Sequence, residues 1–236
     1  MAQAARRRFY REAAAVAAAD GGFRVELDGR PLRTPAGRPF AVPTVALAQA
    51  IAAEWAAQGD DILPASMPMT QLAYTALDRV VPDRDAVAAL VVKYGETDLL
   101  CYRAEGPAEL VARQARAWQP LLDWARDRHG VDLAVTEGVT PVAQPDAAAA
   151  RLAAAVAALD DMALTALAAV VQASGSAVVG LAVLAGRLDG AAAFEVSQLD
   201  ESHQIDRWGE DAEAMARRAL LKSDLEAAVR FLELVA

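Results

Sequence analysis

The chain has 236 residues, and its 23 lysine and arginine residues against 32 aspartate and glutamate residues give a formal charge of −9. This balance argues against a nucleic-acid-binding protein, which needs a basic stripe to displace counterions from phosphates. The single cysteine, Cys101, excludes an internal disulfide and a cysteine-based zinc site, and the length is sufficient for one large or two small hydrophobic cores.

The N-terminal segment carries three arginines, Arg6, Arg7 and Arg8, and lacks the apolar stretch of a secretory signal. An arginine- and alanine-rich start is also compatible with a mitochondrial transit peptide. This one contains little serine, however, and runs within about a dozen residues into sequence typical of a folded domain. We therefore expect a cytoplasmic protein.

Strand patterns follow the N-terminal segment. Phe23, Val25 and Leu27 alternate with polar residues, and the Asp28-Gly29 pair directly after them is a hairpin turn signal. We assign Gly29 a structural role in this turn rather than a role in binding.

A helix is predicted after these strands, with Thr44 as its cap and Gly59 as its end. Trp55 falls on the apolar face of this helix, so we expect it to be a core aromatic residue. Thr70 can cap a further helix. The first section, residues 1–85, is therefore predicted to be a small α+β domain with a short antiparallel sheet.

The second section, residues 86–236, is predicted to be mainly helical. An amphipathic helix is expected over residues 107–130, and Pro120 within it should kink or divide it. Residues 162–185 carry no charge over a length that could span a membrane. Their polar centre and weakly apolar alanines favour two buried helices that meet at Gly175, which we assign a structural role. The overall fold class is α+β with two domains.

Catalytic motifs are absent from the sequence. The two histidines, His129 and His203, are far apart in the sequence. On a helix Asp200 lies three residues before His203 and could touch it, but two ligands do not make a transition-metal site. We therefore expect no catalytic residues, no metal and no cofactor. An alternative hypothesis is a hydrolase that uses His203 together with the carboxylates beside it.

An acidic stretch lies near the C-terminus, with seven acidic residues and one basic residue, Arg207, over residues 195–213. Trp208 recurs at helical spacing with Ile205, Ala212 and Met215, and this spacing predicts that all four face the core. The carboxylates are then left for solvent. This pattern fits either a solvated helix face or a docking surface for a partner protein.

Several segments together resemble a known family, the assembly chaperones for the alpha subunit of the soluble head of the F-type ATP synthase. The similar segments are RFYREA (8–13), VELDGRPLRTPAGRPFAVP (25–43), LAQAIAAEWAAQGDDILPASMPMTQLAYTALDRV (47–80), TDLLCYR (97–103), SGSAVVGLAVLAGRL (174–188) and HQIDRWGED (203–211). They run nearly end to end and follow the order of the family.

The resemblance implies an N-terminal α+β domain, a C-terminal helical domain and no catalytic activity. It implies a protein that binds the unassembled alpha subunit and masks its apolar interface until the beta subunit replaces it. The residues expected to contact the alpha subunit are Glu201, Gln204, Asp206 and Glu210, and Trp208 is expected to be structural. We further expect a monomer with no membrane insertion, bacterial and cytoplasmic here, whereas related eukaryotic members reside in the mitochondrial matrix.

Overall fold

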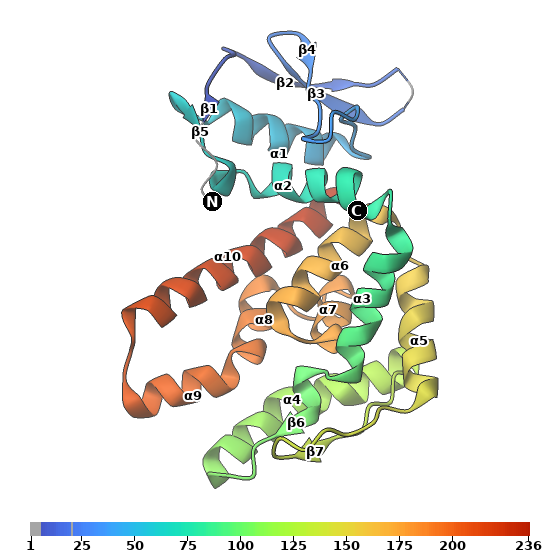
Figure 1. Cartoon of the computed structure of the whole chain (residues 1–236), viewed down its shortest axis with the longest axis vertical. Helices are drawn as coiled ribbons and strands as arrows, with labels where there is room; N and C mark the ends of the chain where they lie inside the picture. The colour runs from blue at the N-terminus through green and yellow to red at the C-terminus, as the bar shows by residue number, and fades with distance from the viewer. Residues whose placement is uncertain (1–5, 20) are drawn as a thin grey trace. The chain divides into compact units, whose positions relative to one another are not determined.

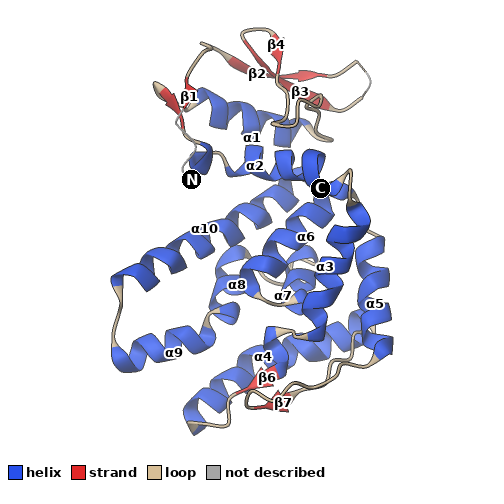
Figure 2. Cartoon of the chain, viewed as in Figure 1, coloured by secondary structure: helices blue, strands red, loops and turns tan. Residues whose placement is uncertain are grey.

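The computed structural model describes residues 6–19 and 21–236. Residues 1–5, part of the segment on which the expected cytoplasmic location rests, lie outside the described residues. The chain forms two compact units, residues 1–84 together with 230–236, and residues 85–229. The α+β fold class is confirmed, and the strands in Figure 2 are few and short beside the helices. The division into two domains stays a proposal.

The first unit contains a small sheet and the helices that cover it (Figure 1). Its elements are β1 (Arg6–Arg7), β2 (Ala13–Ala17), β3 (Phe23–Leu27), β4 (Arg30–Pro31), α1 (Val45–Ala56), β5 (Asp61–Ile62), η1 (Pro64–Ser66), α2 (Pro68–Thr75) and the π-helix η2 (Ala76–Val80).

The sheet of this unit is antiparallel, in the order β2-β3-β4, and β1 and β5 form a separate antiparallel pair. Leu27 pairs with Arg30, so Asp28 and Gly29 form a two-residue turn. Both have positive φ, 50° and 74°, the backbone conformation that a tight hairpin turn requires and that glycine adopts without steric cost.

Helix α1 packs against β2 and β3 and provides much of the first core. Thr44 caps it by accepting a hydrogen bond from the Leu47 backbone N–H at 3.2 Å. The Thr44 hydroxyl also donates to the backbone carbonyl of Leu234, which holds the end of the chain in this unit. Trp55 is buried, as expected of a core aromatic residue, and the Tyr10 hydroxyl donates to its carbonyl at 2.7 Å.

The second unit is an assembly of helices with one short parallel strand pair. Its elements are α3 (Arg84–Glu96), η3 (Leu99–Cys101), β6 (Tyr102–Arg103), α4 (Ala108–His129), β7 (Thr136–Glu137), α5 (Asp146–Ala157), α6 (Asp161–Ser174), α7 (Ala177–Leu184), α8 (Gly190–Ser197), α9 (Leu199–Trp208) and the first part of α10 (Ala212–Val235).

The uncharged segment 162–185 forms two buried helices, as predicted. Helix α6 ends at Gly175, which has a φ of 72°, and Ser176 caps α7. Helix α7 is buried along nearly its whole length and packs against α4, α6 and α8. In the part of the chain that the structure describes, no helix has both the length and the apolarity to cross a membrane.

Of the two effects predicted for Pro120, a kink or a division, the division is wrong, because α4 is one continuous helix. A proline removes only one backbone donor, and the helix carries buried side chains on both sides of it. Trp118, Leu121, Leu122 and Ala125 are all buried, and their packing holds the two halves together. Gly130, with a φ of 69°, ends the helix at the predicted position.

Candidate functional site

The acidic residues singled out in the sequence lie in one part of the helical unit, where α9 is joined to the start of α10 (Figure 1). We call residues 199–218 the acidic arm. It comprises α9, the loop 209–211 and the first two turns of α10. Most of its side chains are exposed, because few neighbouring elements cover it.

One face of α9 anchors the arm to α4 and α8. Leu199 and His203, four residues apart, are both 7% exposed and form the buried stripe of the helix. Two side chains of α4 bind carboxylates beside this stripe. Gln114 donates to Asp200 at 2.7 Å, and Arg113 pairs with Asp206 at 3.1 Å.

A buried arginine, Arg218, joins α10 to α9. Its side chain is 10% exposed and donates to the Ser202 hydroxyl at 2.7 Å and to the side-chain amide oxygen of Gln198 at 3.3 Å. Its guanidinium also lies 3.6 Å from Glu201 and 5.0 Å from the centre of the Phe194 ring. The planar guanidinium can make these contacts at once, which a lysine ammonium could not do with the same geometry.

The four predicted partner-binding residues differ in how free they are. The Glu201 side chain is 29% exposed and faces Arg218, and the Asp206 side chain is 67% exposed and pairs with Arg113. Gln204 and Glu210 are exposed and have no polar side-chain partner among the described residues. Neither Glu201 nor Asp206 is sealed inside the protein, so the arm still presents negative charge to solvent.

The expectation that Trp208 is a core residue is wrong. Its side chain is 74% exposed, and Ala212 is exposed as well. The buried stripe of α9 runs through Leu199 and His203, and Trp208 lies about 140° around the helix from His203 at 100° per residue. The apolar residues at helical spacing do share one side of α9. This side is not the one that α4 and α8 cover.

No acid–base group forms around His203. Its Nε2 atom is buried without a hydrogen-bond partner among the described residues. The neighbouring carboxylates of Asp200, Glu201 and Asp206 face Gln114 and arginines instead. Within residues 6–19 and 21–236, no group of three or more His, Cys, Asp and Glu side chains could hold a metal ion.

Cys101 has the properties of a core residue rather than a nucleophile. It is fully buried, and burial, with the negative charge of Asp98 as a second cause, raises the pKa of its thiol to about 12. The thiolate is the reactive form, so a thiol with this pKa is inert near neutral pH.

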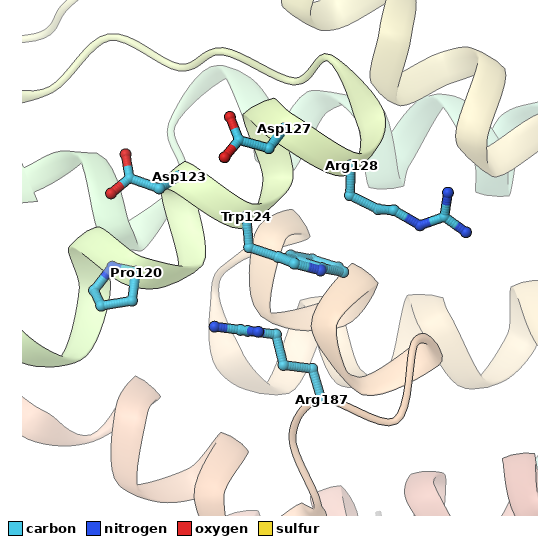
Figure 3. Close-up of a pocket in the computed structure, with 6 residues that line it drawn as sticks. All are labelled: Pro120, Asp123, Trp124, Asp127, Arg128 and Arg187. Carbon is cyan, nitrogen blue, oxygen red and sulfur yellow. The ribbon is translucent and has the colours of Figure 1, made fainter.

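Two hollows lie outside the arm. One, of about 1040 Å³, belongs to the first unit and is lined by aromatic and proline side chains that include Phe9, Tyr10, Trp55, Pro64 and Tyr74. The other, of about 540 Å³, lies in the helical unit and is drawn in Figure 3.

The second hollow has mixed charge. Trp124 and Arg187 lie side by side in it, with the guanidinium 5.9 Å from the ring centre. Asp123 and Asp127 extend from the same helix, and each pairs with Arg126 at 3.1 Å. Its carboxylates are therefore already matched by a cation, and the hollow holds no recognisable catalytic group.

Comparisons with known proteins agree on one family. A family model described as ATP12 chaperone protein matches residues 7–126. The mitochondrial protein atp12 of Schizosaccharomyces pombe is 28% identical over 225 residues, which cover 87% of this chain and 75% of that protein.

Solved structures give the same result at higher identity. The crystal structure of Atp12 from Paracoccus denitrificans is 45% identical with a TM-score of 0.92, and the match covers 98% of each chain. A mutant of the same Paracoccus protein matches at 44% identity with a TM-score of 0.92 and equal coverage.

Proposed function

Because this chain belongs to the ATP12 chaperone family and is an ATP synthase assembly chaperone, we propose that it binds the unassembled alpha subunit of the catalytic head. In this proposal the chaperone masks the apolar interface of the alpha subunit until the beta subunit replaces it. We propose that the chaperone acts as a monomer in the bacterial cytoplasm. It catalyses no reaction.

The physical need for such a chaperone follows from the nature of obligate oligomers. Their subunit interfaces are large and apolar, so a subunit without its partner exposes a surface that promotes aggregation. A protein that covers this surface and is later displaced keeps the subunit soluble.

The observation that carries the proposal is the exposed acidic arm on a unit that is itself acidic. Residues 85–229 contain 22 acidic and 12 basic residues, whereas the rest of the chain is nearly balanced. Negative charge gathered on one unit favours a basic partner surface and disfavours other acidic proteins. We propose that Glu201, Gln204, Asp206 and Glu210 make the contact.

Glu210 provides the cleanest test of this proposal. It has no ion pair among the described residues, so Glu210→Lys changes the charge of the arm without breaking an internal contact. We expect this variant to bind isolated alpha subunit about tenfold more weakly and to suppress its aggregation less well, since opposite charges across an interface are replaced by like charges.

The matched control is Glu137→Lys, which makes the same charge change at an exposed residue of β7 in the same unit. Binding should be measured by biolayer interferometry and aggregation by light scattering. If the two variants bind the alpha subunit equally well, the acidic arm is not the contact surface. If the unchanged protein does not bind the alpha subunit, the proposed function itself is wrong.

A further inference from the structure

We propose that Trp208 is the apolar anchor of the acidic arm, and that it inserts into an apolar recess rimmed by lysine and arginine side chains on the partner protein. This inference rests on the proposed function, because it takes the alpha subunit as the partner. It adds the residue that supplies the apolar contact and the chemistry of the site that receives it.

Trp208 differs from the other tryptophans of the chain in its exposure. Trp118 is fully buried, Trp55 is 7% exposed and Trp124 is half-buried, whereas Trp208 is 74% exposed. An exposed indole leaves a large apolar area in water, and residues of this type are enriched at the centres of protein interfaces. Its exposure leaves the indole available for contact with another molecule.

The end of α9 presents this side chain. The helix stops at Trp208, and Gly209 follows with a φ of 89°, a backbone conformation that side chains rarely adopt. The chain then turns through the loop 209–211, which we call the tip of the arm, into α10 (Figure 1). Trp208 is therefore the last residue of α9 before this tip.

Helical spacing places Trp208 with two of the predicted partner-binding residues. Gln204 is four residues before it and Glu201 is seven before it, so all three lie along one side of α9. This side is separate from the buried stripe of Leu199 and His203. The tryptophan and the polar residues can thus contact the same partner surface.

The charges around Trp208 decide what kind of partner fits. Asp206, Glu210, Asp211 and Glu213 are all exposed near the tip, and Arg207 is the one basic residue between them. An acidic rim repels nucleic acid and anionic membrane surfaces, and it would repel the identical rim of a second copy of this chain. A protein surface with a basic rim around an apolar recess matches the arm in charge and also receives the apolar indole of Trp208.

Fluorine NMR tests the inference directly. The chaperone is labelled with 5-fluorotryptophan, which gives one signal for each of four tryptophans, and the Trp208 signal is assigned from the Trp208→Phe variant. On addition of unlabelled, isolated alpha subunit, we expect the Trp208 signal to shift and to lose its sensitivity to replacement of H₂O by D₂O. The signals of the buried Trp55 and Trp118 should not change.

Affinity provides the second measurement. Trp208→Ala should weaken binding of the alpha subunit about 30-fold, the effect typical of an interface hot spot. The matched control is Leu220→Ala, at a similarly exposed apolar residue of α10 (68%), for which we expect less than a threefold change. Circular dichroism should show both variants folded, because neither side chain is buried.

The outcomes separate the two proposals. If the alpha subunit binds but the Trp208 signal is unchanged and Trp208→Ala binds as tightly as the parent, the anchor is refuted and the proposed function stands. If the signal shifts with chaperone concentration alone, a second copy covers Trp208 and the anchor is also refuted. If no alpha subunit binds to the parent chain, both proposals fail.

Discussion

Arg218 is predicted to hold the acidic arm in place, and its replacement by methionine tests this role. Arg218→Met keeps an apolar side chain of similar length but removes the charge. The lost charged hydrogen bond to Ser202, at 2.7 Å, is worth about 1.5–3 kcal/mol. The lost contact with the Phe194 ring adds about 0.5–1 kcal/mol, and the partly exposed pair with Glu201 adds at most about 1 kcal/mol.

These contributions overlap, so we expect Arg218→Met to lower the free energy of unfolding by about 2–4 kcal/mol. Urea titration followed by far-ultraviolet circular dichroism measures this change. Amide hydrogen exchange over residues 199–208 should become faster than in the parent, because α9 loses its attachment to α10.

The adjacent Arg217 supplies the control. Its side chain is 81% exposed and lies 3.9 Å from Glu201, so Arg217→Met should cost less than about 0.5 kcal/mol. Equal losses of stability in the two variants, or unchanged exchange of α9 in Arg218→Met, would refute the role of Arg218 as the link between α9 and α10.

Two further predictions concern the helical unit. At Gly190 an added Cβ would lie 2.7 Å from the Glu226 Cα. Gly190→Ala should therefore lower the free energy of unfolding by about 1–3 kcal/mol in urea titrations. The control Gly59→Ala, at a site with open space, should be near neutral. Burial raises the pKa of Asp98 from its ordinary 3.8 to about 6, against hydrogen bonds that lower it. Folding therefore favours the protonated form of Asp98. The contribution of this group to the free energy of unfolding is full below about pH 4 and is lost as the pH rises through about 6. Titrations from pH 4 to pH 7 should show the parent losing about 2 kcal/mol relative to Asp98→Asn, and equal pH profiles would contradict this assignment.

Local sequence signals were sufficient for much of the fold. The two-residue turn at Asp28 and Gly29, the cap at Thr44 and the helix junction at Gly175 each depend on short-range geometry, which the residue types themselves impose. The strand Ala13–Ala17 carried no such signal, since alanine has little preference for strands. It forms because it pairs with β3 and packs on α1.

The acidic arm was located from its sequence, but its geometry was not. Composition placed the carboxylates of Glu201, Asp206 and Glu210 in one stretch, yet it gave no sign that Arg113 and Arg218 lie beside two of them. Arg113 lies on α4, 93 residues before Asp206, and Arg218 lies on α10. Only the packing of α4 and α10 against α9 brings these arginines close to the carboxylates.

The residue types therefore determined where helices, turns and caps form, because these depend on neighbours within a few positions. Tertiary structure alone decided which side of α9 is covered. A helical repeat fixes which residues share a face, but the elements that pack against the helix decide which face is buried. On α9 they bury His203 and leave Trp208 in solvent.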